Sequence, residues 1–467
     1  MERYDLIILG GGAGGFAAAI RANELGTKAA LVNSGLPFGG TCVNVGCVPS
    51  KFLLWVGEIM HLAENHGIPG LKLKLDGFDF SQVVRDELRL VEHLRREKYE
   101  KVLAGLDNIS VLEGEARFAS KDTLKVNGEI ISAEKFIIAT GSTANVPPIE
   151  GIEETGYMTH IEALKLTKLP KELIIIGAGP LGLEFAQMYA RFGTKVTVLE
   201  RIPSIFPHTE AVLAARLAEL LGKEGIVIKT GVEVISTRIE NGKKTVSFKE
   251  QEETKEVNAE EILLAAGKTA NTGKLNLETA GVKTDRRKSI VVSDFLQTSN
   301  PGIFAVGDVT NLPLRLEITA GREGTLACSN AITGAQDSIN YSTVPYTIFT
   351  DPQLAGVGYT EKEQMKQIGS CSCRTVSFEN IPKAMIQKRT EGLIKMAIHP
   401  KTNQIMGVHI LAPNAGELVT TAMMLIKNKN TIDDLVGSTP MFPTLSEAFK
   451  LVALSFTKDI ARLSCCT

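Results

Sequence analysis

Two cysteines near the N-terminus stand where their thiols could do redox chemistry. The segment Thr41-Cys-Val-Asn-Val-Gly-Cys-Val-Pro-Ser-Lys51 follows a Gly-Gly pair and places Cys42 and Cys47 at the expected start of a helix. A thiol at a helix N-terminus has a lowered pKa and reacts as the thiolate. The alternative is a pair of small buried residues. The motifs around the pair, described below, favour the reactive interpretation.

A second pair of cysteines closes the chain, which ends Leu463-Ser-Cys-Cys-Thr467. A structural role in packing does not explain two adjacent thiols at a terminus, because free ends are poorly ordered and exposed thiols oxidise. Two neighbouring thiolates do, however, form a site for a soft metal ion. Cys465 and Cys466 are therefore predicted to bind such an ion.

The other cysteines carry weaker signals. Cys371 and Cys373 alternate in an expected strand, so both side chains point to one face, as metal ligands or only as a surface pair. Cys328 lies in an apolar helical pattern and is predicted to be a core residue. The seven cysteines are an odd number and too few for a disulfide scaffold.

The first reactive pair follows a glycine-rich turn. An apolar strand over residues 6–9 leads into Gly10, Gly12 and Gly15, and a helix is predicted over residues 16–25. Glycines allow the tight turn and let the backbone approach a pyrophosphate, while free N–H groups at the helix start bind the anion. This unit therefore predicts a dinucleotide site.

The same unit occurs a second time. An apolar strand over residues 173–176 is followed by Gly177, Gly179 and Gly182 and by an expected helix over residues 183–192. Two such units predict two dinucleotides.

Between the units, helices are predicted over residues 52–66 and 80–103 and strands around residues 110–116 and 123–127. In the C-terminal part, helices are predicted over residues 416–428 and 446–456.

In each unit the second strand ends where a residue that binds the ribose is expected. This residue is Asn33 in the first unit and Glu200 in the second. Asn33 can still bond a hydroxyl, so weaker retention of the ligand is expected rather than loss of binding. Glu200 slightly favours NADH, whereas the adjacent Arg201 could accommodate the 2′-phosphate of NADPH.

Composition excludes several classes of protein. The 467 residues are 44% hydrophobic and 22% charged, which is typical of a folded globular chain of several domains. The net charge of −2 provides no overall attraction for a polyanion, so nucleic acid is not expected as a partner. A secretory signal is not expected, because the glycine turn begins at residue 10, and a membrane span is not expected either. The predicted location is the cytoplasm.

The segment GGTCVNVGCVPSK resembles the redox-disulfide signature of the flavin-dependent disulfide reductases, the class I pyridine nucleotide-disulfide oxidoreductases. The segments ATGS (139–142), AVGD (305–308) and VPYTIFTDPQLAGVGYTE (344–361) follow in the family's order, so the resemblance covers nearly the whole chain. It implies an α/β fold with two Rossmann-like dinucleotide-binding domains and a C-terminal α+β dimerisation domain. The implied boundaries are 1–150 and 271–340 for the two parts of the FAD-binding domain, 151–270 for the NAD(P)H-binding domain, and 341–467 for the dimerisation domain with the cysteine tail.

The resemblance also implies roles for individual residues. It places the Cys47 thiolate against the flavin and Lys51 beside the flavin ring, paired with Glu184, and Asp308 near the ribityl chain. The residues assigned to FAD are Gly10, Gly12, Gly15, Asn33, Thr41, Lys51, Gly141 and Asp308, and those assigned to NADH or NADPH are Gly177, Gly179, Gly182, Glu184, Glu200, Arg201 and Gly267.

One departure from the family points to the substrate. Members that reduce disulfides carry a histidine that protonates the departing thiolate, and this chain has Phe442 there, in Phe-Pro-Thr. Phenylalanine cannot move a proton. Together with the Cys-Cys tail, this resembles the mercuric reductases of the family. The expected function is FAD-dependent reduction of Hg(II) by NAD(P)H in a homodimer, with Cys465 and Cys466 taking Hg(II) from small thiols and passing it to Cys42 and Cys47.

Alternatives remain open at this point. Mercuric reductases often carry tyrosines where this chain has Phe442 and Pro180, and their frequent N-terminal metal-binding module is not expected, because the sequence starts at the predicted FAD unit. A large thioredoxin reductase also has a C-terminal cysteine pair, although its mechanism uses the absent histidine. An alternative from another class is a non-catalytic flavoprotein or a metal-binding partner protein.

Overall fold

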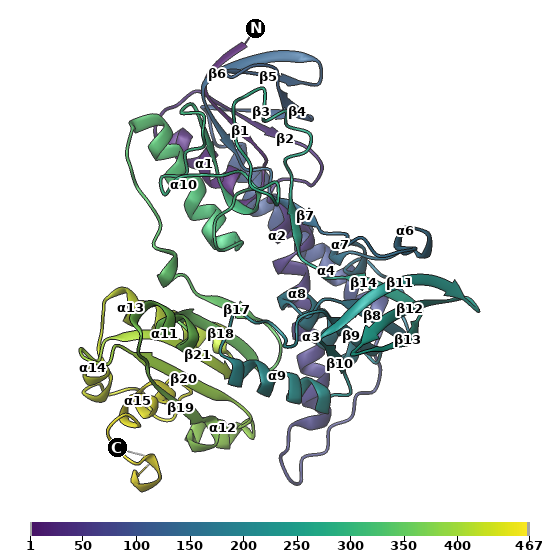
Figure 1. Cartoon of the computed structure of the whole chain (residues 1–467), viewed down its shortest axis with the longest axis vertical. Helices are drawn as coiled ribbons and strands as arrows, with labels where there is room; N and C mark the ends of the chain where they lie inside the picture. The colour runs from purple at the N-terminus through teal and green to yellow at the C-terminus, as the bar shows by residue number, and fades with distance from the viewer. Residues whose placement is uncertain (1, 465–467) are drawn as a thin grey trace.

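The computed structural model describes residues 2–464 of the chain. Its larger sheets form three units, and a long helix, α3 (Cys47–Asn65), runs down the middle of the view in Figure 1. The first two units each contain parallel strands that lead into a glycine turn, and the sheet of the third is antiparallel. The predicted α/β class is therefore confirmed.

The first unit is a seven-stranded sheet with the order β3-β2-β1-β6-β5-β4 and with β16 paired to β6. Its strands are β1 (Glu2–Leu9), β2 (Ala29–Asn33), β3 (Ile109–Glu113), β4 (Ala116–Phe118), β5 (Thr123–Val126), β6 (Glu129–Ile138) and β16 (Ile303–Ala305). Because β16 comes from much later in the chain than β6, residues on both sides of the second unit in sequence complete one sheet.

Two helices, α1 (Ala13–Glu24) and α10 (Glu317–Thr333), cover one face of this sheet. Leu6 and Ile8 of β1 pack toward these helices, and Ile7 and Leu9 pack into the core on the other face, as the period of a strand requires. Cys328 of α10 is fully buried among them, so the prediction that it is a core residue is confirmed.

One predicted strand was wrong in extent. The stretch expected around residues 110–116 is two strands, because β3 ends at Glu113 and β4 starts at Ala116. Between them Gly114 adopts a φ of +153°, a conformation that side chains of L-residues rarely allow. The side chain of Asn127 donates to the carbonyl oxygen of Glu113 at 2.7 Å and fastens this break.

A long helical segment connects β2 to β3 of the first sheet. It consists of α2 (Gly40–Val45), α3, α4 (Phe80–Arg95), a π-helical segment (Arg96–Glu100) and α5 (Lys101–Leu103). The helices predicted over 52–66 and 80–103 are confirmed, with α3 starting earlier, at Cys47. Among the described residues, Gly40–Asn65 is long and apolar enough to span a membrane by length and composition alone, with a mean hydropathy of 1.2. This stretch packs against α4 and α8 on one side, and its side chains Trp55 and Ile59 are exposed on the other.

The second unit begins with a four-stranded parallel sheet in the order β10-β9-β8-β14. Its strands are β8 (Glu172–Ile176), β9 (Lys195–Glu200), β10 (Val227–Thr230) and β14 (Glu261–Leu264), with helices α6 (Ile152–Thr155), α7 (His160–Ala163), α8 (Pro180–Arg191) and α9 (Ala211–Lys223). An antiparallel sheet of β11 (Val232–Glu240), β12 (Lys243–Glu250) and β13 (Glu253–Ala259) extends from it. The short pair β7 (Ser142–Ala144) and β15 (Lys268–Ala270) joins this unit to the first.

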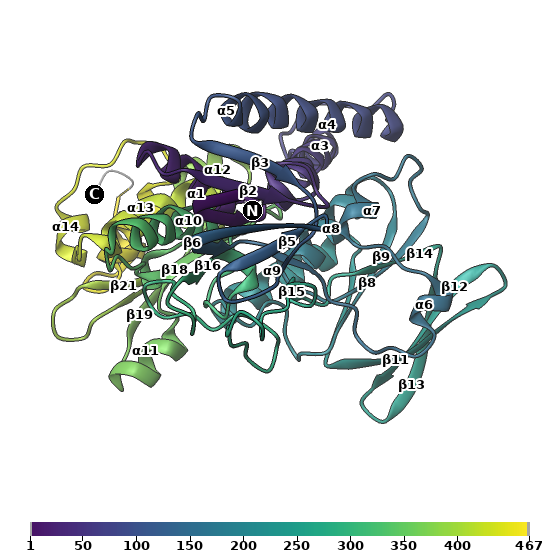
Figure 2. The same ribbon diagram turned by 90° about the horizontal axis from the view of Figure 1, so that it is seen from above.

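The third unit is a five-stranded antiparallel sheet with the order β17-β18-β21-β20-β19. Its strands are β17 (Tyr346–Ile348), β18 (Gln353–Gly358), β19 (Ser372–Ser377), β20 (Leu393–Ile398) and β21 (Ile405–Ala412), and its helices are α11 (Glu361–Ile368), α12 (Pro382–Gln387), α13 (Ala415–Lys427), α14 (Ile432–Val436) and α15 (Glu447–Leu454). Figure 2 shows this unit and the β11–β13 sheet at opposite ends of the molecule. The predicted helices at 416–428 and 446–456 correspond to α13 and α15.

Candidate active site

The two N-terminal cysteines lie on either side of a break between two helices. Cys42 belongs to α2 and Cys47 is the first residue of α3, with Gly46 between the helices at φ −137°. Both thiols are free in the structure. Both cysteines therefore lie at a helix start as predicted, Cys42 in the first turn of α2 and Cys47 at the first residue of α3, but the two starts belong to different helices because the first helix ends at Val45.

The two thiols have different acidities. A hydrogen bond donated by the Cys42 thiol lowers the pKa of Cys47 to about 7, with help from the Lys51 ammonium and against the effect of burial. The same hydrogen bond, together with burial, raises the pKa of Cys42 well above its usual range. Above about pH 7 the pair therefore holds one proton and one negative charge, and the charge lies on Cys47.

Lys51 lies one helical turn after Cys47 and is held by two other parts of the chain. Its Nζ lies 2.7 Å from Oε2 of Glu184, which comes from α8 of the second unit. The same ammonium lies 4.6 Å from the ring centroid of Phe349, and the backbone N–H of Phe349 donates to Oε1 of Glu184 at 2.9 Å. Phe349 directly follows β17, so all three units meet beside the cysteines. This brings together Lys51 and Glu184, the pair that the family resemblance implies.

The first glycine turn closes tightly on its own backbone. A Cβ on Gly10 would overlap the carbonyl of Ala139, and one on Gly15 would overlap the carbonyl of Gly10. Gly12 is the N-cap of α1, so the free N–H groups of that helix start at this turn. Asn33 does not lie free for a ligand, because its Oδ1 accepts the N–H of Gly11 at 2.9 Å.

A cavity of about 820 Å³ opens beside this turn. Among the residues that line it are Gly10, Gly12, Asn33, Thr41 and Gly141, all of them predicted FAD residues. The volume lies in the range of cofactor sites, and glycines without side chains next to a helix N-terminus suit a pyrophosphate. These residues therefore fit a dinucleotide.

No pattern in the sequence predicted some of the hydrogen bonds near this cavity. Oδ2 of Asp308 accepts the hydroxyl of Ser142 at 2.7 Å, which ties the AVGD and ATGS segments together. Oε2 of Glu323, a buried residue of α10, accepts the N–H of Gly307 at 2.6 Å. Burial raises the pKa of Glu323. The pattern around Glu323 predicted only a helix, and nothing in it indicated a carboxylate under the AVGD turn.

The second glycine turn repeats the contacts of the first. A Cβ on Gly177 would overlap the carbonyl of Ala265, and one on Gly182 would overlap that of Gly177. Glu200 accepts the N–H of Ala178 at 2.6 Å through Oε2 and the N–H of Ile202 at 2.8 Å through Oε1. Gly179 is the N-cap of α8, whose first residue is Pro180, and Arg201 is exposed.

Lys268 and His160 were missed by the sequence analysis. Lys268 follows Gly267, which has a φ of +96°, and its Nζ lies 3.5 Å from Nε2 of His160. Burial lowers the pKa of Lys268, against the attraction of Asp308. Burial and the Lys268 ammonium lower the pKa of His160 to about 4, so this ring is neutral at pH 7. The signal that could have found Lys268 is its place directly after a predicted cofactor glycine.

At the end of the third unit, the side chain at position 442 cannot move a proton. Phe442 is 46% exposed. With Leu463 and Ser464 it lines a cavity of about 550 Å³. Cys465 and Cys466, predicted to bind a soft metal ion, lie outside the described residues.

Comparison with known proteins assigns the family. Residues 4–333 match the model of the pyridine nucleotide-disulphide oxidoreductases, and residues 344–453 match the dimerisation domain of the same family. The chain belongs to this family. It is therefore an oxidoreductase of the class that uses FAD and NAD(P)H. The predicted family and cofactors are confirmed.

Relatives within the pyridine nucleotide-disulphide oxidoreductases match nearly the whole chain. A mercuric reductase of Staphylococcus aureus is 37% identical over 466 residues, 99% of this chain and 84% of the relative. A mercuric reductase of Streptomyces lividans is 37% identical over 469 residues, 99% of this chain and 98% of the relative. Among solved structures, the HOCl-induced flavoprotein disulfide reductase RclA of Escherichia coli has a TM-score of 0.86 at 28% identity, covering 97% of this chain and all of that one.

Proposed function

We propose that this oxidoreductase reduces Hg(II) to Hg(0) with electrons from NADH or NADPH. The observation that carries the proposal is the identity of 37% to mercuric reductases along nearly the whole chain. The unequal thiols Cys42 and Cys47 support it, because a soft thiolate and a second thiol together suit a soft cation. FAD, when bound, would pass the electron pair of the nicotinamide coenzyme to this site.

Several residues of this chain have separate roles in binding Hg(II). The Cys47 thiolate makes the first bond to Hg(II), and Cys42 loses its proton when the second bond forms. Lys51 keeps positive charge beside Cys47, and Glu184 fixes the position of that ammonium. Two electrons then convert Hg(II) to Hg(0), while NAD(P)H gives NAD(P)⁺ and one proton. Because the reduction step releases Hg(0) and breaks no disulfide bond, it has no departing thiolate for an acid at position 442 to protonate.

The proposal includes delivery by the C-terminal pair in a homodimer. Cys465 and Cys466 take Hg(II) from small thiols by ligand exchange and pass it to Cys42 and Cys47 of the partner subunit. The match of residues 344–453 to a dimerisation domain supports the dimer. The shared cavity of Phe442, Leu463 and Ser464 supports a tail that runs beside the segment where disulfide reductases carry their acid. The assignment of the remaining cofactor residues, the domain boundaries and a cytoplasmic location belong to the same proposal.

The test is anaerobic turnover with purified holoenzyme. NADH or NADPH is mixed with Hg(II) and excess small thiol, and coenzyme oxidation and mercury vapour are followed together. Parallel reactions contain oxidised glutathione, lipoamide or oxidised thioredoxin. We expect mercury vapour in step with coenzyme oxidation and little turnover of the disulfides. Turnover of thioredoxin without mercury vapour would refute the proposal in favour of a thioredoxin reductase.

Variants test the roles of the two cysteine pairs, Cys42 with Cys47 and Cys465 with Cys466, separately. Cys47→Ser should lower mercury reduction on the order of 10³-fold or more, because it removes the attacking thiolate. The double variant Cys465→Ser, Cys466→Ser should be slow with thiol-bound Hg(II), and Cys371→Ser, Cys373→Ser is its matched control with full activity. A tail variant as fast as the parent would remove the delivery step and leave the reduction itself standing.

Copper is the second candidate substrate. The RclA relative has also been solved as a Cu(II) complex, with a TM-score of 0.87 and 28% identity to this chain. A parallel reaction with Cu(II) therefore belongs in the same experiment. Coenzyme oxidation with Cu(II) at a higher kcat/KM than with Hg(II) would favour copper.

A further inference from the structure

Cys371 and Cys373 form a sulfur pair far from the candidate active site of their own subunit. They lie at the start of β19, the edge strand of the five-stranded sheet. The opposite edge is β17, which leads to Phe349 beside Lys51. Strands are spaced by about 4.8 Å, so four spacings put about 19 Å between the two edges. The pair therefore needs an explanation of its own.

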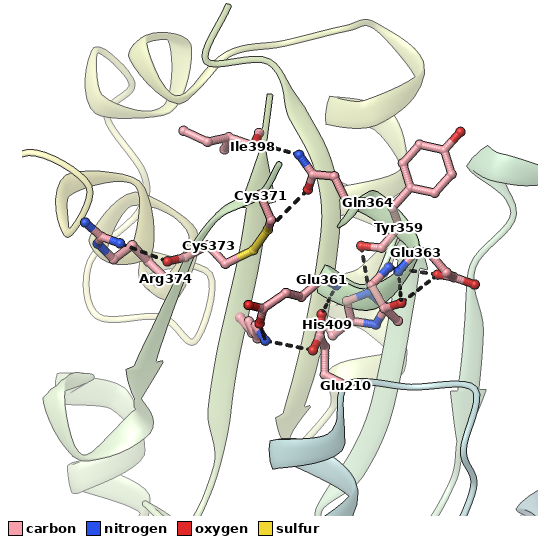
Figure 3. Close-up of a disulfide and its surroundings, with 12 residues drawn as sticks. Glu210, Tyr359, Glu361, Glu363, Gln364, Cys371, Cys373, Arg374, Ile398 and His409 are labelled. Atoms are coloured by element: carbon pink, nitrogen blue, oxygen red, sulfur yellow. Dashed lines mark hydrogen bonds and ion pairs between the residues drawn. A yellow bond between two sulfur atoms is a disulfide. The ribbon is translucent and has the colours of Figure 1, made fainter. Parts of the chain in front are cut away.

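The structure joins these two cysteines in a disulfide, with Cα atoms 6.0 Å apart. Figure 3 shows Glu361, the first residue of α11, beside the two sulfurs. One carboxylate oxygen of Glu361 and the two Sγ atoms all lie within 4.8 Å of one another. Cys371 just before β19 and Cys373 within it thus lie beside the carboxylate of the first residue of α11.

The carboxylate is held in place by a buried lysine. Nζ of Lys395 lies 2.5 Å from Oε2 of Glu361 and 2.7 Å from Oε2 of Glu210. The backbone N–H of Glu361 also donates to Oε1 of Glu210 at 2.6 Å. Glu361 is still half exposed, so an ion from solvent can reach it. The position of its carboxylate does not depend on the cysteines.

The surroundings also suit the reduced form of the pair. Nε2 of the fully buried Gln364 donates to the carbonyl of Ile398 at 2.8 Å, which fixes the orientation of the amide. Its Oε1 therefore faces Sγ of Cys371 at 3.5 Å (Figure 3). A disulfide sulfur has no proton to donate, whereas a thiol does. The amide oxygen is thus ready for the Cys371 thiol.

We propose that Cys371, Cys373 and Glu361 bind a soft divalent cation when the disulfide is reduced. Two thiolates and one carboxylate are a ligand set that suits Zn(II) or Cd(II), with a fourth position left for water. Two small monothiols supply the two electrons and two protons that open the disulfide, and they leave as their own disulfide. The two thiols then lose two protons when they bind the cation. This site works without NAD(P)H and is independent of mercury reduction.

The test uses Cd(II) alone as the probe. The holoenzyme carries Cys42→Ser, Cys47→Ser, Cys465→Ser and Cys466→Ser, which removes the other two pairs. It is reduced with a small thiol, desalted without oxygen and titrated with Cd(II), while thiolate-to-cadmium charge-transfer absorption and equilibrium dialysis report binding. The matched protein carries Cys371→Ser and Cys373→Ser in addition. FAD absorbance in both proteins checks that they are folded.

We expect about one Cd(II) per subunit in the reduced protein, and none in the matched variant or in the oxidised protein. Glu361→Gln should weaken binding about tenfold, the effect typical of losing one partner at a metal site. Glu379→Gln, an exposed glutamate just beyond the other end of β19, should leave binding unchanged. Equal binding with and without Cys371 and Cys373 would overturn the proposal, as would a disulfide that monothiols cannot open in the folded protein. Equal effects of the two glutamate variants would remove Glu361 from the site.

Discussion

The two glycine turns of this molecule are built alike. In each, the N–H of the first glycine bonds the second strand of its unit, from Gly10 to Val32 at 2.8 Å and from Gly177 to Leu199 at 2.8 Å. In each, the third glycine allows the helix to pack against the carbonyl of the first. In each, a side chain at the end of the second strand accepts an N–H of the turn. The same physical solution therefore serves two sites in one chain.

The surroundings of the two turns differ. Gly40 of α2 lies against Gly12, and Gly324 of α10 packs against the carbonyl of Gly14, so other helices close the first turn from two directions. A Cβ on Gly179 of the second turn would meet nothing within 4 Å. An enclosed turn suits a cofactor that stays bound, whereas an open turn suits a coenzyme that is exchanged in every cycle. The difference favours FAD at the first turn and NAD(P)H at the second, which is the assignment that the family resemblance implies.

Among changes that test the difference between the two turns, filling the third glycine of each turn should have the largest effect. Gly15→Ala and Gly182→Ala each place a methyl group on a carbonyl oxygen, and such overpacking costs about 1–3 kcal/mol. We expect Gly15→Ala to raise the dissociation constant for FAD about tenfold or more, measured by the flavin absorbance that remains with the protein after gel filtration. Gly182→Ala should keep its FAD and show a KM for the coenzyme raised by a similar factor. Loss of FAD in both variants to the same extent would contradict the assignment of one cofactor to each turn.

A second test acts where the two units meet, at Lys51 and Glu184. The pKa of Cys47 is held at about 7, below its usual value, so its thiolate is present above pH 7 and is lost as the pH falls. Alkylation of the reduced enzyme by iodoacetamide should therefore rise about tenfold between pH 6 and pH 8. Lys51→Met should move this rise to higher pH, because it removes the nearby positive charge.

Two variants serve as controls for this titration. Lys51→Arg keeps the charge and should keep the profile closer to that of the parent. Cys47→Ser should remove the reactive phase altogether, since Cys42 keeps its proton in this range. A Lys51→Met profile identical to that of the parent would show that the Cys42 hydrogen bond alone sets the acidity of Cys47.

The sequence predicted what depends on neighbours along the chain. Both turns, their flanking strands and the helix start at Cys47 follow from glycine spacing and apolar runs, and the structure contains them. The pairing of Lys51 with Glu184 came from the family resemblance, since no local pattern links residues so far apart. Even local patterns failed at Gly114, where a left-handed glycine cut an expected strand in two.

What the sequence could not predict are contacts between distant segments. Glu323 lies under the AVGD turn only because α10 packs back onto the first sheet. The closeness of Glu361 to the disulfide of Cys371 and Cys373 becomes visible only once the start of α11 is placed beside the start of β19. The expected role of Asn33 at a ribose hydroxyl stays a prediction, and the structure adds that this side chain also fastens its own turn.

The variant with the smallest expected effect tests what makes the first turn retain its cofactor: the charge of the side chain at the strand end, or the enclosure of the turn by other helices. Asn33→Glu gives the first turn the carboxylate that Glu200 provides in the second. A charged acceptor bonds the N–H of Gly11 more strongly than an amide oxygen, although the bond from Asn33 to the carbonyl of Leu36 is lost. We expect FAD release to slow by a few-fold, consistent with about 0.5–1.5 kcal/mol for one hydrogen bond. Glu200→Gln is the reciprocal control and should raise the coenzyme KM without changing FAD release. If Asn33→Glu releases FAD no more slowly than the parent, the packing of Gly40 and Gly324 around the first turn sets retention, and the residue at the strand end does not.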